Sequence, residues 1–237
     1  MGGLNPPTTS LGTAEIYNGT TWTSISNLGT ARYNMGSAGT SSAALGFGGY
    51  IGGNTAATEE YNDWTPAAGY NFQNEGQVWY NNTENVWKVQ DSATVGSWAT
   101  ASPLSTARNG LGGAGLQTAG LAFGGTIPPT STSTEEYDGS TWTAGGSLTT
   151  GRRLGASFGI QTAAVLSGGL NAPNATQSIT EEYDGATWTS GGSLNTGRYQ
   201  TGGAGTQTAG LAIGGEPPTY SSYTEEYDRD RDWETST

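Results

Sequence analysis

The 237-residue chain contains no cysteine and no histidine, and only 12% of its residues are charged. Without cysteine and histidine it cannot form a disulfide, a zinc site built on thiolate or imidazole, or a Cys-His or Ser-His-Asp nucleophilic site. The net charge is −12, and Lys88 is the one lysine. A protein that follows nucleic-acid phosphates needs a basic patch, so this charge balance argues against nucleic-acid binding.

Long hydrophobic runs are also missing. No segment approaches the roughly 20 consecutive apolar residues that a membrane-spanning helix needs. Residues 1–7 have neither the basic nor the apolar region of a secretory signal. We therefore expect no membrane span and no export by a leader within this chain.

Glycine is abundant instead, with 40 residues in the chain. Such a content, together with much serine and threonine, is typical of flexible linkers. However, the chain also has eight tryptophans and twelve tyrosines, and disordered segments are poor in aromatic residues. The order of the residues therefore has to decide between a linker and a folded repeat.

A repeat of about 45 residues runs through the chain. Its first block, TEEYDGxTWT, occurs at 134–143 and 180–189, with weaker copies that start at 13, 58 and 224. Its second block ends in the Gly pairs 48–49, 124–125, 168–169 and 214–215. The repeat also places a tryptophan and an arginine in constant register: Trp22, Trp98, Trp142, Trp188 and Trp233, and Arg32, Arg108, Arg152 and Arg198.

Each unit predicts four short strands, which in the clearest copy lie near residues 111–115, 118–123, 134–137 and 141–143. Gly pairs and the Asp138-Gly139 dipeptide are turn signals between such strands. Units of 40–50 residues with four strands each are typical of propeller blades around a central axis. The small residues of the first strand fit the crowded space near that axis.

These motifs resemble a known family. Tyr-Asp, a following Trp, a Thr-x-Arg triplet (30–32, 106–108 and 196–198) and a Gly pair are similar to the kelch repeat. The amino-acid sequences of the two blocks resemble the kelch-like arrays of bacteriophage and bacterial surface or virion proteins. The resemblance implies an all-β, kelch-like propeller of four-stranded blades, which spans 1–237 as a single domain. Kelch propellers serve as scaffolds, adhesins and occasionally enzymes, so the resemblance specifies the fold far better than the function.

The number of repeats is uneven. The Tyr-Asp-Trp block occurs five times and the Arg-to-Gly-Gly block four times, which predicts four complete blades and an N-terminal half-blade. Either an imperfect five-blade arrangement or a fragment of a longer array explains this count, and the duplicated halves favour the fragment. The run Asp228 to Asp232 has three alternating aspartates but lacks the glycine and the bidentate acid of a calcium loop. We interpret residues 228–237 as a solvated or non-native tail.

The second unit carries an insertion at 63–95. Two β-prone runs, 76–80 and 86–89, flank a polar five-residue turn and predict a hairpin. Trp79, Tyr80 and Trp87 are interface-type side chains on an element that the propeller does not need. They serve either as binding anchors or as rings that pack the hairpin onto the propeller.

Four glutamate pairs, at 59–60, 135–136, 181–182 and 225–226, could suggest glycosidase chemistry. Because the pair recurs in every unit, we interpret it as part of the framework. Neighbouring residues of a strand point to opposite faces, so we expect one glutamate to meet a repeat arginine and the other to face water. The tryptophans are likewise interpreted as rings that pack the blades.

We therefore expect a non-enzymatic interaction or adhesion module of a phage virion or bacterial surface protein, located on a virion or an extracellular surface. A carboxylate-dependent glycan-active enzyme and a purely structural spacer are the alternatives. The partner would be a protein or a cell-surface glycan, no cofactor or metal is expected, and the oligomeric state stays open. The variable loops that follow the Gly pairs, 50–57, 126–133, 170–179 and 216–223, would present the ligand contacts. With the insertion they supply the candidate binding residues: Trp79, Tyr80, Trp87, Tyr50, Asn171, Asn174, Tyr220 and Tyr223.

Overall fold

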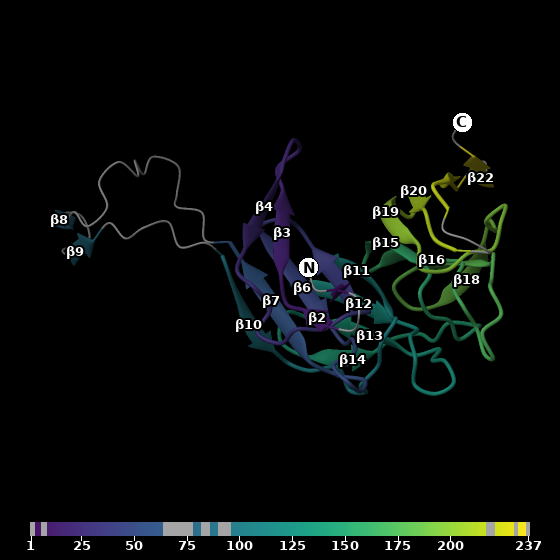
Figure 1. The fold of residues 1–237 in the computed structure, drawn as a ribbon, viewed down its shortest axis with the longest axis horizontal. Coiled ribbons are helices and arrows are strands. Elements are labelled where there is room, and N and C mark those ends of the chain that lie inside the picture. Colours follow the sequence, from purple (N-terminus) through teal and green to yellow (C-terminus); the bar gives the residue numbers. More distant parts are fainter. Residues whose placement is uncertain are drawn as a thin grey trace.

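The computed structural model describes residues 3–5, 9–63, 78–81, 86–89, 96–216, 221–229 and 232–235. For 3–5, 78–81, 86–89 and 232–235 it describes the backbone pairing alone. The chain is all-β and forms a propeller of four four-stranded antiparallel blades (Figure 1). Within the described residues no helix is long and apolar enough to cross a membrane.

Each blade is a sheet whose strands follow one another in chain order. Blade 1 consists of β5 (Gly36–Gly39), β6 (Ala43–Phe47), β7 (Thr58–Asn62) and β10 (Ser97–Ala101). Blade 2 consists of β11 (Gly112–Leu116), β12 (Ala119–Phe123), β13 (Thr134–Tyr137) and β14 (Trp142–Ala144). Blade 3 consists of β15 (Ala156–Ile160), β16 (Ala163–Ser167), β17 (Thr180–Tyr183) and β18 (Trp188–Gly191). Blade 4 consists of β19 (Gly202–Thr206), β20 (Ala209–Ile213), β21 (Thr224–Asp228) and β22 (Asp232–Thr235). The first strands of successive blades contact one another, β5 with β11, β11 with β15 and β15 with β19.

Two further pairs of strands precede blade 1. β3 (Ala14–Tyr17) and β4 (Trp22–Ile25) form an antiparallel hairpin, which corresponds to the third and fourth strands of a blade and confirms the predicted half-blade. β1 (Gly3–Asn5) pairs with β2 (Thr9–Leu11). In Figure 1 the β3–β4 hairpin is on the side of blade 1, and blade 4 is on the opposite side of the molecule.

The insertion leaves blade 1 intact, because β7 and β10 pair directly through Asn62 and Ser97 on either side of it. Inside the insertion, β8 (Val78–Asn81) pairs with β9 (Val86–Val89), which confirms the predicted hairpin. The expectation of a tail after Asp228 is wrong for the described residues, since β22 pairs with β21 and completes blade 4. Strand pairing rests on backbone hydrogen bonds, which a run of charged side chains does not prevent.

A buried arginine anchors each blade. Arg108 has no exposed surface, and its guanidinium donates to the carbonyl of Ser133 at 2.9 Å and to Glu135 at 2.8 Å. Burial lowers the pKa of Arg108, and the charge of Glu135 opposes that shift. The corresponding ion pairs of the other blades are Arg32–Glu59, Arg152–Glu181 and Arg198–Glu225. The prediction that one glutamate of each pair meets a repeat arginine is confirmed.

The second glutamate of the pair joins neighbouring blades. The hydroxyl of Tyr137 in blade 2 donates to Glu60 in blade 1 at 2.6 Å, and that of Tyr183 in blade 3 donates to Glu136 in blade 2 at 2.6 Å. Tyr227 of blade 4 donates to Glu182 of blade 3 in the same way. The expectation that this glutamate faces water is therefore wrong for Glu60, Glu136 and Glu182. A buried phenol needs an acceptor, and the preceding blade supplies one.

Tryptophans complete the same contact between blades. The indole N–H of Trp142 in blade 2 donates to Thr58 of blade 1 at 3.2 Å, and its ring meets Phe47 edge-on at 5.1 Å. Trp188 of blade 3 donates to Thr134 of blade 2 at 2.9 Å and meets Phe123 edge-on at 4.9 Å. The interpretation of these two rings as blade packing is confirmed.

The tyrosine contacts predict a loss of stability at alkaline pH. Burial and the hydrogen bond to Glu136 raise the pKa of Tyr183 to about 12, whereas an unfolded tyrosine titrates near 10. The folded protein therefore keeps this proton where the unfolded chain loses it, and the free energy of unfolding should fall as the pH rises from about 10 to about 12. Denaturant unfolding across this range tests it. In a Tyr183→Phe variant the pH slope should be shallower, and an unchanged slope would contradict the assignment.

Candidate interaction surface

The loops that follow the Gly pairs have a constant base. In all four blades the first glycine N–H bonds the far end of the loop: Gly48 to Ala57, Gly124 to Ser133, Gly168 to Ile179 and Gly214 to Tyr223, at 2.9–3.0 Å. The carbonyl of the second glycine accepts a bond from within the loop, from Thr55, Ser131, Gln177 and Ser221, at 2.8–2.9 Å. Both glycines have positive φ in every blade, which favours glycine at these positions. The frame of each loop is thus constant while its tip varies.

A second set of variable residues lies beside these loops. The residue after each anchoring arginine pairs through its backbone with the residue after each Gly pair, as an isolated antiparallel bridge. We name these residues the variable rim: Tyr33 with Tyr50, Asn109 with Thr126, Arg153 with Leu170, and Tyr199 with Glu216. The four bridges share one backbone geometry and differ in side-chain chemistry.

Backbone hydrogen bonds link the rim from blade to blade. The N–H of Gly110 donates to the carbonyl of Asn34 at 2.7 Å, that of Leu154 to Gly110 at 2.8 Å, and that of Gln200 to Leu154 at 2.7 Å. All four residues have φ between 53° and 64°, although only one is glycine. Non-glycine residues in this left-handed region need a surrounding structure that holds them. The bonded chain supplies that constraint and keeps the rim in a fixed arrangement.

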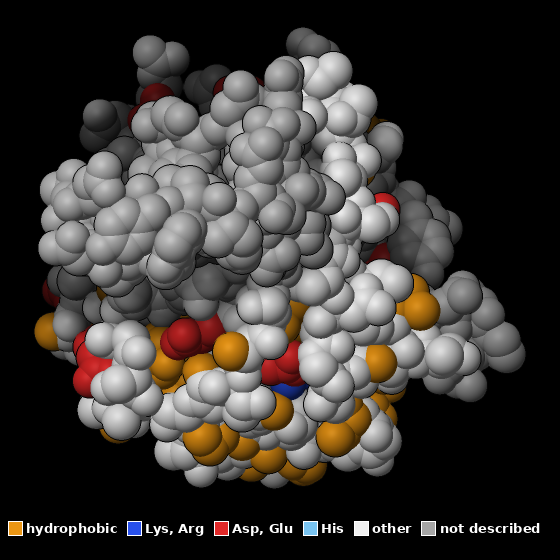
Figure 2. Space-filling view, turned by 90° about the vertical axis from the view of Figure 1, so that its left-hand side faces the viewer, with side chains coloured by type: hydrophobic (Ala, Val, Ile, Leu, Met, Phe, Trp, Pro, Cys, Tyr) orange, Lys and Arg blue, Asp and Glu red, His pale blue; other side chains and the backbone are white. Residues whose placement is uncertain are grey.

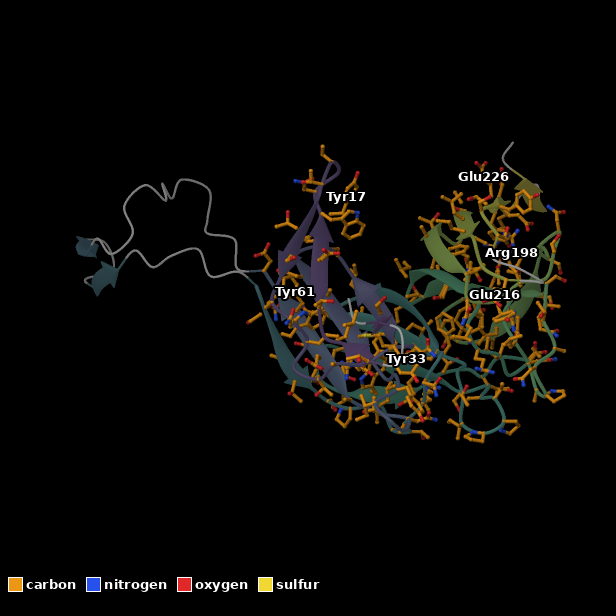
Figure 3. All side chains as sticks on the ribbon, viewed as in Figure 1. Tyr17, Tyr33, Tyr61, Arg198, Glu216 and Glu226 are labelled. Atoms are coloured by element: carbon orange, nitrogen blue, oxygen red, sulfur yellow. The ribbon has the colours of Figure 1, made fainter. Side chains whose placement is uncertain are left out.

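Tyr50, a predicted binding residue, belongs to the rim. Its ring lies 5.3 Å from that of Tyr33, with a tilt of 50° between the planes. Both side chains are partly exposed, and Tyr33, labelled in Figure 3, lies between β4 and β5. Ile51, next in the loop, is 50% exposed. Tyr33, Tyr50 and Ile51 therefore give blade 1 a partly apolar, aromatic edge.

Asn171 and Asn174 lie in one turn of the blade 3 loop. The N–H of Asn174 donates to the carbonyl of Asn171 at 2.6 Å, and the Asn174 side-chain oxygen accepts from Arg153 at 3.0 Å. The structure therefore brings Asn174 into contact with the rim. The side-chain oxygen of Asn171 is buried and has no hydrogen-bond partner among the described residues. Blade 3 thus presents amides and a guanidinium where blade 1 presents rings.

The remaining predicted residues are placed only in part. Tyr223 is 69% exposed and contributes its carbonyl to the Gly214 and Arg198 contacts of blade 4. Tyr220 lies outside the described residues. Tyr80 is paired with Trp87 across the β8–β9 hairpin, and Trp79 with Lys88, but their side chains are outside the described part. The choice between anchors and packing rings in the insertion stays a prediction.

Half of the rim was missed from the sequence. The rim residues that follow the Gly pairs, Glu216 among them, lie within the predicted loops, whereas the four that follow the anchoring arginines were not selected. One of these, Tyr199, donates to Glu216 at 2.5 Å in blade 4. The available signal was the position after the constant arginine, which holds Tyr33, Asn109, Arg153 and Tyr199 in turn. A position whose residue differs between repeats, next to one that is the same in all of them, indicates a surface side chain that the repeat fold does not require.

The described part of the face in Figure 2 shows acidic and hydrophobic side chains, and basic ones are almost absent from it. The anchoring arginines are buried in their ion pairs, whereas the side chain of Arg229 is 54% exposed. The expectation that the chain does not bind nucleic acid stays a prediction.

The turns at the opposite ends of the third strands have a structural role. Asp138 accepts hydrogen bonds from the backbone N–H groups of Thr141 at 2.7 Å and Ser140 at 2.8 Å. These bonds lower the pKa of the exposed Asp138 carboxyl to about 2. The Asp-Gly turn thus uses its carboxylate to close the hairpin between β13 and β14.

A cavity of about 420 Å³ lies between the first strands of the blades. The described residues that line it are Ser37, Thr40, Ser157 and Phe158 together with glycines and alanines, and none of these is titratable. The Ser157 hydroxyl accepts the N–H of Gly113 at 3.2 Å and thereby bonds blade 3 to blade 2. The described lining of the cavity therefore offers hydroxyl and backbone groups for binding.

Comparison with models of known protein families finds no match for this chain, and no curated protein matches it significantly.

Proposed function

We propose that the chain is a non-enzymatic interaction module that holds a protein or a cell-surface glycan on the variable rim and the loops after the Gly pairs. The observation that carries the proposal is the constant loop base with a varying tip in all four blades. Loops on a rigid scaffold are the usual place for binding residues. The exposed and partly exposed rings of Tyr33, Tyr50 and Tyr223 are side chains of the kind that anchor interfaces.

The similarity of the repeat sequences to kelch-like arrays supports a location on a bacteriophage virion or a bacterial surface. A virion or surface appendage needs a stable scaffold and a changeable contact surface, and the repeat combines the two. The insertion in blade 1 adds an element outside the sheet, since β7 and β10 pair without it. We propose the insertion as a second contact region.

The glutamate pairs give the enzyme alternative little support. Glu59, Glu135, Glu181 and Glu225 are engaged with buried arginines. Glu60, Glu136 and Glu182 accept tyrosine hydroxyls of the next blade. A glycosidase needs two carboxyl groups aimed at one scissile bond, whereas these carboxylates repeat along the framework.

Binding measurements with a rim variant test the proposal. The labelled chain is applied to a glycan array and to a panel of bacterial cells. Replacing both Tyr33 and Tyr50 with alanine should weaken the binding that the unaltered chain shows by at least about tenfold, because aromatic anchors dominate interface energies. Ser140→Ala, in the turn at the other end of β13, is the matched control and should bind normally. Equal binding by the rim variant would contradict the assignment, and no binding by the unaltered chain would favour the structural spacer.

The contribution of the insertion is separated by a deletion of residues 66–92. The deletion should leave the propeller folded, because the Asn62–Ser97 pairing closes blade 1. If adhesion to the same cells or partner proteins stays unchanged, the insertion is not a contact region.

A further inference from the structure

The contact between blades is built from two different faces. The following blade contributes a tyrosine and a tryptophan, such as Tyr137 and Trp142 of blade 2. The preceding blade contributes a glutamate that accepts the tyrosine hydroxyl and an apolar residue that packs on the tryptophan, such as Glu60 and Phe47 of blade 1. We name these the Tyr-Trp face and the Glu face. Every blade that has both neighbours uses both faces.

The Tyr-Trp face of the β3–β4 hairpin is uncovered. Tyr17 is 48% and Trp22 is 66% exposed, whereas Tyr137 and Tyr183 are buried. The two rings of the hairpin lie 5.1 Å apart with planes at 35°, which matches the pair Tyr183–Trp188 at 5.0 Å and 34°. The hairpin therefore holds its rings in the arrangement that docks on a Glu face elsewhere in this chain.

The Glu face of blade 4 is uncovered as well. Ile213, at the position of the fully buried Phe47 and Phe123, is 43% exposed. Glu226, at the position of Glu60, is exposed, and no hydrogen bond is described for its carboxylate. The inner strand β19 is exposed along its length, while β11 and β15 alternate with buried residues.

The two uncovered faces belong to the first and the last units of the repeat, and Figure 3 shows Tyr17 on the hairpin apart from Glu226 on blade 4. The end of the hairpin is bonded to blade 1, since the Ser26 hydroxyl donates to the carbonyl of Gly96 at 2.5 Å. Tyr17 and Trp22 line an open pocket with Tyr61 and Trp98 of blade 1. Within one molecule the Tyr-Trp face does not cover blade 4, because Trp22 and Ile213 are both exposed. A second copy can present blade 4 to it without any rearrangement.

We propose that copies of this chain associate head to tail, with the Tyr-Trp face of one hairpin seated on blade 4 of the next copy. In the assembly the Tyr17 hydroxyl donates to Glu226 and the Trp22 ring packs on Ile213, as Tyr137 and Trp142 do on blade 1. The contact is heterologous, so it builds a row or a closed ring of copies. This association goes beyond the binding of a ligand and does not depend on it.

Sedimentation velocity of the full chain at increasing concentration tests the proposal. The mean mass of the unaltered chain should rise with concentration. Trp22→Ala removes one face and Ile213→Lys the other, so each variant alone should stay monomeric. An equimolar mixture of these two variants should form dimers and nothing larger, because only one productive pair of faces remains. Both residues are exposed, so the variants should fold.

Two further variants sharpen the result. Tyr17→Phe keeps the ring and loses the bond to Glu226, so the dissociation constant should rise about tenfold. Ile160→Ser, an equally exposed apolar side chain on β15, should associate like the unaltered chain. A chain that stays monomeric at about 1 mM, or two variants that fail to pair when mixed, would overturn the proposal. A monomer that loses thermal stability on Trp22→Ala would place the hairpin on its own blade 4 instead.

Discussion

Glu181→Ala is expected to lower the free energy of unfolding by about 3–5 kcal/mol, because it leaves a buried cation without its counter-charge. Glu181 is 1% exposed and binds the guanidinium of Arg152 at 3.0 Å. It also accepts the backbone N–H of Thr149 at 2.7 Å and the Thr149 hydroxyl at 2.6 Å. Arg152 itself has no exposed surface, so water cannot replace the lost carboxylate. Denaturant unfolding at neutral pH, followed by circular dichroism, measures the loss.

The matched control is Glu15→Ala. Glu15 stands two residues before Tyr17, as Glu181 stands two residues before Tyr183, but it is exposed. Surface substitutions of this kind change the free energy of unfolding by about 0.5 kcal/mol or less. If Glu181→Ala cost no more than Glu15→Ala, the ion pair would not anchor the blade.

The ion pairs show what the sequence could predict. Arginine and glutamate recur together in each unit, and a strand sends neighbouring residues to opposite faces, so a pairing of the two was predictable from spacing alone. The four-strand blade was predictable for the same reason, since the turn glycines and the tryptophans mark each strand end. Both inferences rest on contacts within one repeat unit, which a periodic pattern records directly.

Contacts between units were not predictable in this way. Glu60 and Tyr137 are far apart in the sequence, and the pattern does not say which face of a blade meets its neighbour. The second glutamate was therefore assigned to water, although in blades 1 to 3 it accepts a tyrosine hydroxyl of the adjacent blade. The half of the rim that follows the anchoring arginines was missed for a related reason: Arg153 meets Leu170, a residue of a predicted loop, only because the loop base returns the chain beside the arginine.

Charge misled the interpretation of the C-terminal residues. The run at 228–232 suggested a solvated tail, but Arg229 contacts Glu182 at 3.3 Å and β22 pairs with β21. The position of Trp233 in register with the other framework tryptophans was the better guide. In a repeat, agreement with the period predicts strand pairing more reliably than local composition does.

The second large effect on the free energy of unfolding is expected near the propeller axis, where the first strands of neighbouring blades pack closely. Gly113→Val is expected to lower the free energy of unfolding by about 3 kcal/mol, because added atoms force packed strands apart. A Cβ at Gly113 would lie 2.4 Å from the carbonyl oxygen and 2.8 Å from the nitrogen of Ser37, and 2.8 Å from the ring of Phe47. Ser37 belongs to β5 of the preceding blade, and its backbone cannot move without disturbing that sheet. Thermal and denaturant unfolding measure the change.

Gly202→Val provides the comparison on an equivalent inner strand. A Cβ at Gly202 would have its nearest neighbours in Ile213, at 3.8 Å, which is an ordinary contact distance. The backbone there is a strand, where valine is favoured, so the free energy of unfolding should change by less than about 1 kcal/mol. Equal losses for both variants would mean that glycine serves the strand itself and not the contact between blades. A loss confined to Gly113→Val would assign this glycine to the approach of β11 to β5, which is the contact that sets the spacing of the first two blades.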